Sequence, residues 1–275
     1  MIDSLFDLTG KVAVVTGAGA NGGVGHALAV GFAQHGADVI AADIDEAGAK
    51  TTAAEIQALG QKALAMYCDI SQPKDVEHLF AEVDQHFNQI DILVNVPYIL
   101  PSRVHPDELS LADWHKTLDV CLTGYFLCAQ QALRRMLNHD SGGSILNIGS
   151  IAGMTALGRG NFPYSVAKAG IGQMTKELAV EYAGQGIRVN AILPAQILTP
   201  GMKRELLGDP RFGEKLRQRV LVGIPLNRFL EPEDFVGPAV FLCSAAAGAV
   251  TGVLLPVDGG NLALNAGGSH TWPTE

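Results

Sequence analysis

Three side chains in the middle of the chain have the types and the spacing of an acid/base site. Tyr164 and Lys168 stand four residues apart, so on a helix they would share one face. A nearby ammonium favours the phenolate, which would lower the tyrosine pKa and make Tyr164 a usable proton donor and acceptor near neutral pH. Ser150, fourteen positions before Tyr164, could bind a carbonyl or alcohol oxygen. These residues predict proton transfer at a substrate oxygen.

A glycine-rich loop, TGAGANGGVG at residues 16–25, directly follows the apolar run at 12–15. Glycines between a strand and a helix let the backbone approach a pyrophosphate, and the helix N-terminus supplies unpaired N–H groups. The glycines fit two registers, which are Gly17-x-Gly19-x-x-Gly22, the dinucleotide fingerprint, or Gly17 with Gly23-Val24-Gly25, a related loop that usually has two residues fewer.

Asp43 follows the second apolar run, Val39-Ile40-Ala41-Ala42, where an acid would support a dinucleotide site. A carboxylate at this place can accept both hydroxyls of the adenosine ribose and would repel a 2′-phosphate. No Lys or Arg lies in the glycine loop or just after Asp43 to bind that phosphate. The sequence therefore predicts NAD rather than NADP as the cofactor.

Short β-branched apolar runs alternate with helical stretches along the chain, a pattern typical of a parallel sheet covered on both faces. Right-handed crossovers then give a doubly wound α/β sheet that binds its ligand at the carboxyl ends of the strands. The predicted strands are Val12–Thr16, Asp38–Ala42, Ala63–Cys68, Ile92–Asn95, Ser144–Ile148, Arg188–Leu193 and Gly252–Pro256. The predicted helices are 25–35, 46–59, 73–87, 112–138, 162–184 and 232–245. Residues 1–275 are expected to form one Rossmann-like domain of about seven strands, with 196–225 as its long excursion.

Composition excludes several classes of protein. The net charge of −9, from 19 Lys+Arg and 28 Asp+Glu, argues against nucleic acid as a partner. The N-terminus lacks a signal peptide, and the uncharged segment 235–257 is interrupted by Pro238, Gly248 and Gly252, so we expect no membrane span. The cysteines have neither CxxC nor metal-binding spacing, which predicts packing thiols in a cytoplasmic protein without a metal. They are Cys68, Cys121, Cys128 and Cys243.

In order and along nearly its whole length, the chain resembles the short-chain dehydrogenase/reductase family. Ser150, Tyr164 and Lys168 fit the catalytic positions of that family, and Gly17 with Gly23-Val24-Gly25 fits its cofactor loop, which favours the second register. Further matches are Asp69-Ile70, Asp91-Ile-Leu-Val-Asn95, Arg188-Val-Asn-Ala-Ile-Leu-Pro194 with Thr199, Ile224-Pro225-Leu-Asn-Arg228, Glu231-Pro232-Glu233 and Val257-Asp258-Gly259-Gly260.

The resemblance implies an NAD-dependent alcohol dehydrogenase or carbonyl reductase. Tyr164 would take the hydroxyl proton as a hydride passes to the nicotinamide, Ser150 would hold the substrate oxygen, and Lys168 would bind the ribose and tune Tyr164. The residues expected at the cofactor are Gly17, Asn21, Gly23, Val24, Asp43, Asp69, Ile70, Asn95, Tyr164, Lys168, Pro194, Ile197 and Thr199. The residues expected at the substrate are Ser102, Arg103, Ser150 and Tyr164.

The resemblance also implies a lid at 196–225 and a homotetramer that pairs through helix 162–184 and the final strand. The tail at 261–275, which contains Trp272, could pack on a neighbour's active site. Residues 196–219 carry six basic side chains against three acidic ones. Arginine binds carboxylates well, so a polar or anionic substrate such as a sugar acid fits, although a solvated amphipathic helix explains these charges equally well.

The chain departs from the family pattern at four places. The cofactor loop is two residues longer, Asn95-Val96-Pro97-Tyr98 stands where the family has NNAG, and Ala195 replaces a glycine. Cys121, in DVCLTG, replaces an asparagine whose backbone carbonyl, in the family, holds a water next to the lysine. Because a backbone carbonyl survives a side-chain change, we expect an active enzyme with a buried Cys121. The alternative is a non-catalytic NAD-binding regulator or scaffold of the same fold.

Overall fold

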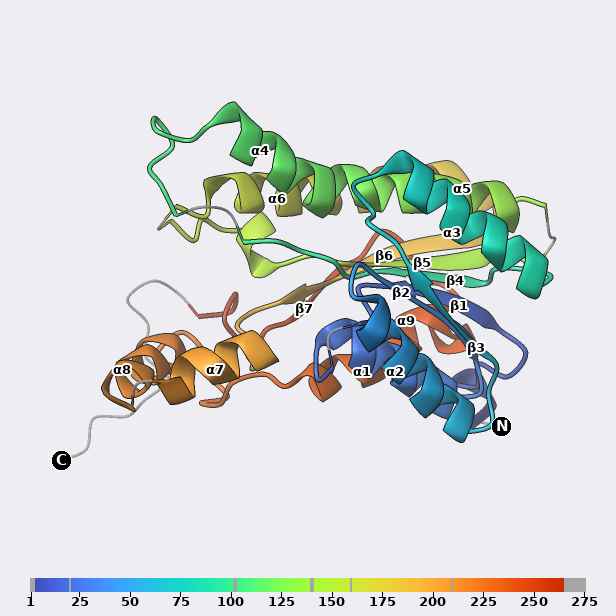
Figure 1. The fold of residues 1–275 in the computed structure, drawn as a ribbon, viewed down its shortest axis with the longest axis horizontal. Coiled ribbons are helices and arrows are strands. Elements are labelled where there is room, and N and C mark those ends of the chain that lie inside the picture. Colours follow the sequence, from blue (N-terminus) through green and yellow to red (C-terminus); the bar gives the residue numbers. More distant parts are fainter. Residues whose placement is uncertain are drawn as a thin grey trace.

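The computed structural model describes residues 3–19, 21–100, 103–138, 141–158, 160–208 and 210–264. Its centre is a seven-stranded sheet in the order β3-β2-β1-β4-β5-β6-β7, in which all neighbouring strands are parallel (Figure 1). The strands are β1 Val12–Thr16, β2 Asp38–Asp43, β3 Ala63–Tyr67, β4 Ile92–Asn95, β5 Gly143–Ile148, β6 Ile187–Pro194 and β7 Leu254–Val257. The predicted doubly wound α/β sheet is confirmed.

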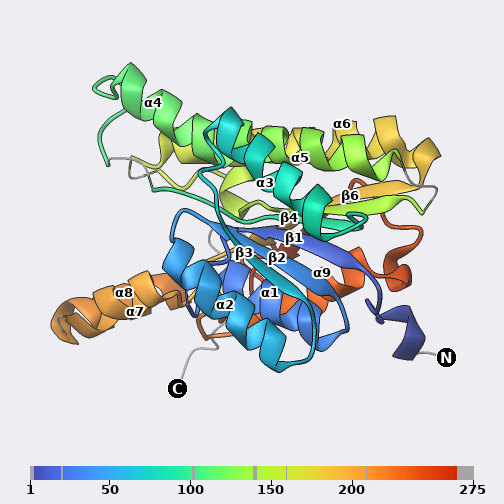
Figure 2. The same cartoon turned by 45° about the vertical axis from the view of Figure 1, so that its right-hand side comes forward.

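Helices cover both faces of this sheet (Figures 1 and 2). Helices α1, α2 and α9 lie on one face, and α3, α5 and α6 lie on the other, where α4 continues the line of α5. Their bounds are α1 Val24–Gln34, α2 Glu46–Ala58, α3 Pro73–His86, α4 Leu111–Leu118, α5 Gly124–Met136, α6 Phe162–Tyr182 and α9 Val236–Cys243.

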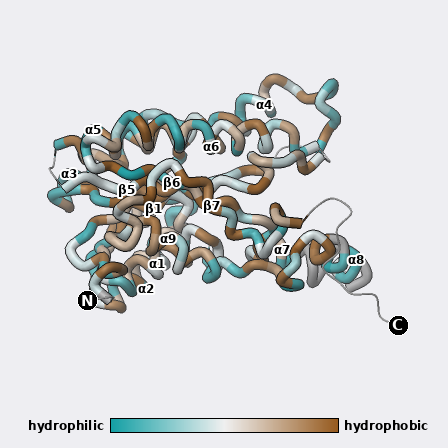
Figure 3. The backbone as a smooth tube through the Cα atoms, turned by 180° about the vertical axis from the view of Figure 1, so that it is seen from behind, coloured by the Kyte–Doolittle hydropathy of each residue, from teal (hydrophilic) through white to brown (hydrophobic). Residues whose placement is uncertain are grey.

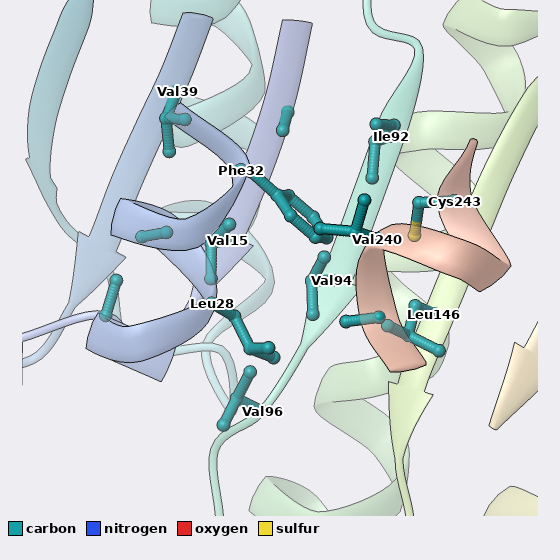
Figure 4. Packing of buried hydrophobic residues seen from close by; sticks show 14 of the residues in the cluster. Val15, Leu28, Phe32, Val39, Ile92, Val94, Val96, Leu146, Val240 and Cys243 are labelled. Carbon is teal, nitrogen blue, oxygen red and sulfur yellow. The ribbon is translucent and has the colours of Figure 1, made fainter. Parts of the chain in front are cut away.

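The hydrophobic core lies in the two layers between sheet and helices. Strands β1 and β4 are buried at every position, because helices cover them on both sides. Under α1 and α9, Phe32 packs with Val240, Val15 and Val94 (Figure 4). Figure 3 shows the same arrangement as hydrophobic strands between helices whose turns are more hydrophilic. Burial on both faces explains why the strands are apolar runs without alternation.

The strand register brings several loops to one edge of the sheet. Thr16 at the end of β1 pairs with Ala42 of β2 and with Asn95 of β4, and Asn95 pairs with Asn147 of β5. The loops after these strands therefore start at the same level, on both sides of the point where the strand order reverses. Doubly wound sheets bind their ligands at this crevice.

The prediction of one continuous helix at 112–138 is wrong at its centre. A π-helical turn, Asp119–Thr123, separates α4 from α5. Immediately after it, Gly124 approaches Ile70 so closely that an added Cβ would lie 2.7 Å from the Ile70 side chain. A π turn changes the hydrogen-bond pattern of a helix without interrupting its apolar residues, so the residue pattern contains no signal for it. The predicted helix 232–245 likewise begins as a 3-10 turn, Pro232–Phe235, before α9.

The excursion at 196–225 contains two helices, α7 Pro200–Gly208 and α8 Pro210–Leu221, which extend past the carboxyl edge of the sheet (Figure 1). A short parallel bridge between Ile197 and Leu230 joins its start to the chain that returns from it. The tail prediction falls mainly on residues 265–275, which lie outside the described residues.

Two expectations from composition can be compared with the structure. In the part of the chain that the structure describes, no helix has the length and apolarity that a membrane crossing needs, and the segment 235–257 forms α9, a loop and β7. All four cysteines are buried and free, as packing thiols would be.

Candidate active site

A cavity of about 1270 Å³ opens at the carboxyl edge of the sheet. Small-molecule pockets are typically about 300–1,000 Å³, so this cavity has room for a dinucleotide and a small substrate. Fourteen of the predicted site residues line it: Gly17, Asn21, Gly23, Val24, Asp43, Asp69, Ile70, Arg103, Ser150, Tyr164, Lys168, Pro194, Ile197 and Thr199.

The glycine loop ends at a helix N-terminus that faces the cavity. Helix α1 begins at Val24 with Gly23 as its N-cap, and no side chain caps it. The first helical hydrogen bond runs from the Ala27 N–H to the Gly23 carbonyl at 3.0 Å, so the preceding N–H groups have no partner within the helix. The first turn also has no acidic residue. These donors and the positive end of the helix dipole suit a pyrophosphate, and they belong to the register Gly23-Val24-Gly25.

Two glycines of the loop are required by close packing. Gly17 has φ +75°, and an added Cβ there would lie 3.1 Å from the Pro97 ring. A Cβ on Gly25 would overlap the Gly17 carbonyl. Pro97, which stands in place of a glycine turn, therefore packs directly against the start of the cofactor loop.

Asp43 fastens the glycine loop to the end of β2. Its Oδ2 accepts the Gly19 N–H at 2.8 Å, and its Oδ1 accepts the Asp45 N–H at 2.9 Å. An ionised carboxylate offers about four lone-pair positions, so about two remain on the cavity side for ribose hydroxyls. The residue thus fits the predicted cofactor contact and also holds the loop.

Ser150 and Tyr164 meet at the inner end of the cavity. Ser150 follows β5, is 8% exposed, and caps a short 3-10 turn by accepting the Ala152 N–H at 3.1 Å. Tyr164 stands in the first turn of α6, where Pro163 is suited to the helix start. The Ser150 hydroxyl lies near enough to Tyr164 to lower the Tyr164 pKa through hydrogen bonding. The edge of the Tyr98 ring faces Tyr164, with 6.5 Å between the ring centroids.

The expectation of a Tyr164 pKa below its ordinary value is wrong for this structure. Burial raises the pKa of Tyr164 above its ordinary value, and the Ser150 hydrogen bond opposes this rise only in part. Lys168 Nζ lies 5.7 Å from the centroid of the Tyr164 ring. The loss of water around the phenol therefore outweighs the neighbouring charge.

Lys168 is a buried ammonium, 2% exposed. Its Nζ donates to the Ile148 carbonyl at 2.7 Å and to the Tyr125 hydroxyl at 3.2 Å. Burial lowers the pKa of Lys168 to about 8, because an ammonium loses solvation in the interior. The Lys168 side chain is thus mainly charged at neutral pH and loses its charge in mild alkali.

Cys121 lies inside the π turn, close to the segment that follows β4. Its thiol is buried, as expected, and burial raises its pKa. Sγ accepts the Ile99 N–H at 3.5 Å and lies 3.8 Å from the Ile99 carbonyl oxygen, to which it can donate. The thiol therefore links the helix bend to the loop beside the cofactor crevice.

Comparison with known proteins identifies this arrangement. A family model described as "Enoyl-(Acyl carrier protein) reductase" matches residues 17–261. The glucose 1-dehydrogenase 2 of Bacillus subtilis (strain 168) is 38% identical over 255 residues, which are 92% of this chain and 95% of that protein. The chain belongs to the short-chain dehydrogenase/reductase family. It is an oxidoreductase of this family that acts on CH–OH groups with a nicotinamide cofactor.

Two further members of the short-chain dehydrogenase/reductase family bear on the cofactor. The NAD-dependent glycerol dehydrogenase of Listeria innocua serovar 6a is 39% identical over 261 residues, covering 94% of this chain and 96% of that protein. A crystal structure of a candidate 2-deoxy-D-gluconate 3-dehydrogenase from Agrobacterium tumefaciens, with bound NADP, has a TM-score of 0.82 and 36% identity, covering 94% and 99%. The family match thus leaves the choice between NAD and NADP to the residues of the site.

One predicted site residue among those that the structure describes does not line the cavity. The Asn95 side chain is fully buried and donates to Asn147 Oδ1 at 3.0 Å, while its own Oδ1 has no partner among the described residues. Through Asn147, which donates to Thr175 of α6 at 3.1 Å, the Asn95 side chain is held on the face of the sheet that α6 covers, and Val96 and Pro97 line the cavity instead. Ser102 lies outside the described residues.

Two residues at the site had no predicted role: Tyr125, which contacts Lys168, and Met202, which lines the cavity. Tyr125 stands in an apolar helical run, so its pattern indicates packing alone. Of the basic residues in the excursion, Arg204 lines the cavity, while Lys203 pairs with Glu231 at 3.6 Å and Arg217 with Glu214 at 3.8 Å.

Proposed function

We propose that this chain is an NAD-dependent dehydrogenase that interconverts a secondary alcohol and a ketone on a polar small molecule: a sugar, a polyol or a hydroxy acid. The observation that carries the proposal is the meeting of Ser150, Tyr164 and Lys168 at the inner end of a cavity that begins at the glycine loop. The bound cofactor supplies the acceptor or donor of the hydride.

In alcohol oxidation, the Tyr164 oxygen takes the proton of the substrate hydroxyl while Ser150 donates a hydrogen bond to the same substrate oxygen. Lys168 holds the cofactor ribose and places a positive charge beside Tyr164, which favours the phenolate that proton abstraction requires. In ketone reduction the proton returns from Tyr164 to the oxygen. The charge of Lys168 is most valuable at a site where burial already raises the Tyr164 pKa.

Two features favour NAD over NADP. Asp43 lines the cavity with acceptor positions to spare, and its charge opposes a 2′-phosphate. The glycine loop and the residues just after Asp43 contain no Lys or Arg that could bind this phosphate. The Listeria innocua relative named as NAD-dependent is consistent with this choice.

A polar substrate is supported by the lining of the cavity and by the relatives. Arg103, His115 and Arg204 come from three different segments and all line the cavity. Arginine binds carboxylates and hydroxyl groups through several donors, so a sugar acid fits as well as a neutral polyol. The similar proteins named as glucose and glycerol dehydrogenases act on polyhydroxy compounds.

We further propose that residues 196–225 close over the substrate as a lid, and that the protein is a homotetramer in the cytoplasm. The start of α7 lines the cavity through Pro200, Gly201, Met202 and Arg204, which supports the lid. Four buried free thiols suit a reducing compartment. Light scattering on a sizing column tests the assembly, since a monomeric mass at micromolar concentration would exclude the tetramer.

The proposed activity is tested with a panel of sugars, polyols and hydroxy acids, each with NAD and with NADP, by following absorbance of the reduced nicotinamide. We expect turnover of at least one polar alcohol, with a higher kcat/KM for NAD. Tight NADH binding without turnover across the panel would instead favour the non-catalytic regulator or scaffold. Preference for NADP would show that the role given to Asp43 is wrong.

A further inference from the structure

Tyr125 is the largest fully buried side chain beside the proposed active site. It stands in the first turn of α5, directly after the π turn, and is 0% exposed. Its hydroxyl lies 3.1 Å from the Pro97 carbonyl oxygen and 3.1 Å from the Ile148 carbonyl oxygen, and it accepts a hydrogen bond from Lys168 Nζ at 3.2 Å. A phenol has one proton, so it donates to one carbonyl at a time and keeps lone pairs for the ammonium.

The surroundings of Lys168 leave one of its three protons for a ligand. The Ile148 carbonyl takes one proton and the Tyr125 hydroxyl takes a second. Nζ also lies 5.0 Å from the centroid of the Tyr125 ring, whose face attracts a cation. Lys168 lines the cavity, so the remaining proton is available on the cavity side.

We propose that Tyr125 is a positioning residue of this active site, whose buried hydroxyl holds the Lys168 ammonium at the carboxyl end of β5. The inference rests on the role proposed for Lys168 in the dehydrogenase reaction. Tyr125 itself does not line the cavity, and its hydroxyl reaches the lining through its hydrogen bonds with Lys168, Pro97 and Ile148, so it acts through Lys168.

The departures from the family pattern meet around this tyrosine. Cys121, one helical turn before Tyr125, contacts Ile99 through its thiol, and Tyr125 contacts Pro97. Pro97 lies within the segment that replaces the usual glycine turn after β4, and Ile99 directly follows that segment. Two of the departures, Cys121 and Pro97, are thus linked by short contacts to the surroundings of Lys168.

The charge of Lys168 depends on few groups. The titratable groups that face it are Tyr125 from α5, Cys121 from the π turn and Tyr164 from α6. Among the described residues, no carboxylate forms an ion pair with Lys168, and burial lowers its pKa to about 8. A hydroxyl that accepts from a buried ammonium favours the charged form, so its removal should lower the Lys168 pKa further.

The test replaces Tyr125 by phenylalanine, which removes the hydroxyl and keeps the ring. The Lys168 pKa is followed by NMR in protein labelled with ¹³C at the lysine Cε, and Lys168→Met assigns the signal. A hydrogen bond to a charged group corresponds to about one pKa unit, so we expect the Lys168 pKa to fall by about one unit in Y125F. The alkaline limb of the kcat/KM profile should move by the same amount, which lowers activity about twofold at pH 7 and about fivefold at pH 8.

Two further variants separate positioning from packing. Tyr182→Phe removes a hydroxyl at the far end of α6, and it should leave both the Lys168 pKa and the pH profile unchanged. Tyr125→3-fluorotyrosine keeps the ring and the hydroxyl but weakens the oxygen as an acceptor. It should shift the Lys168 pKa in the same direction by a smaller amount, and it tests the proposal if Y125F does not fold.

An unchanged Lys168 pKa in Y125F or in the fluorotyrosine variant would overturn the proposal and leave Tyr125 as a packing residue, whatever its effect on Tm. The NMR titration needs no substrate, so it tests Tyr125 even if no alcohol is turned over. Conversely, turnover with an unmoved pKa would reject only the positioning role and keep the dehydrogenase.

Discussion

The Asp43 carboxylate has two roles that substitution can separate. It accepts the N–H groups of Gly19 and Asp45 at 2.8 and 2.9 Å, and its charge faces the place expected for the 2′ position of the ribose. Asp43→Ala removes both roles. Asp43→Asn removes the charge and keeps one oxygen that can accept the Gly19 N–H, while its NH₂ group cannot accept the Asp45 N–H.

The size of each effect follows from these contacts. Two unit charges about 4 Å apart repel by about 4 kcal/mol at an effective dielectric constant of about 20. Solvent screening at the partly exposed Asp43 reduces this to about 1–3 kcal/mol, so both variants should lower the NAD-to-NADP ratio of kcat/KM by about 5- to 150-fold. The two lost backbone contacts should also cost Asp43→Ala about 1–2 kcal/mol of unfolding free energy, of which Asp43→Asn should retain about half.

Two measurements check this reasoning. Steady-state kinetics with each cofactor gives the ratio of kcat/KM, and urea unfolding gives the free energy of the loop contacts. A cofactor ratio that is the same in wild type, Asp43→Asn and Asp43→Ala would refute the electrostatic argument. Equal stabilities of the three proteins would refute the claim that Asp43 fastens the glycine loop.

Three other predictions concern Cys121, Lys168 and the substrate. Cys121→Asn should change kcat by less than about tenfold, because the two thiol contacts with Ile99 are weak and each lost hydrogen bond costs about 1 kcal/mol. A rise of orders of magnitude in steady-state turnover would mean that the natural enzyme is impaired. Burial lowers the pKa of Lys168 in the folded protein from 10.5 to about 8. Between pH 8 and pH 10.5 the unfolded chain therefore binds more protons than the folded protein. The contribution of Lys168 to the free energy of unfolding should thus rise with pH over this range. Urea unfolding of wild type and Lys168→Met should show their difference in unfolding free energy moving in favour of wild type by about 2–3 kcal/mol over this range, and a constant difference would contradict the burial argument. If Arg103 and Arg204 attract an anionic substrate, the kcat/KM of a sugar acid should exceed that of the neutral polyol and fall with added salt; equal efficiencies that do not respond to salt would remove the idea.

The fold could be predicted from the sequence because its physical requirements leave marks on single segments. Buried parallel strands need apolar residues on both faces, and all seven runs found in this way became strands with ends within about two residues. Gly25 is required by a contact that no larger residue tolerates, and Gly17 by its φ of +75°. Asp43 could be predicted as a cofactor contact because an acid at the end of the second strand of such a sheet typically binds the ribose of the dinucleotide.

The features that could not be predicted depend on contacts between segments that lie far apart in the sequence. The π turn at Asp119–Thr123 keeps the apolar period of a helix, so nothing distinguished it from one continuous helix. The Lys168 charge suggested a lowered Tyr164 pKa, but the desolvation that raises it depends on side chains from several segments. Tyr125 was missed for the same reason, since its hydroxyl meets Lys168 only after α5 and α6 pack together.

The most direct test of the central claim is Tyr164→Phe, which removes the proposed acid/base and leaves the ring in place. A lost general acid/base should lower kcat by about 10²- to 10⁴-fold, while NADH affinity measured by fluorescence titration changes by less than about threefold. Tyr182→Phe, remote from the cavity on the same helix, serves as the control for loss of a tyrosine hydroxyl. The account predicts NADH binding without turnover in Tyr164→Phe, and near-normal turnover in that variant would contradict it.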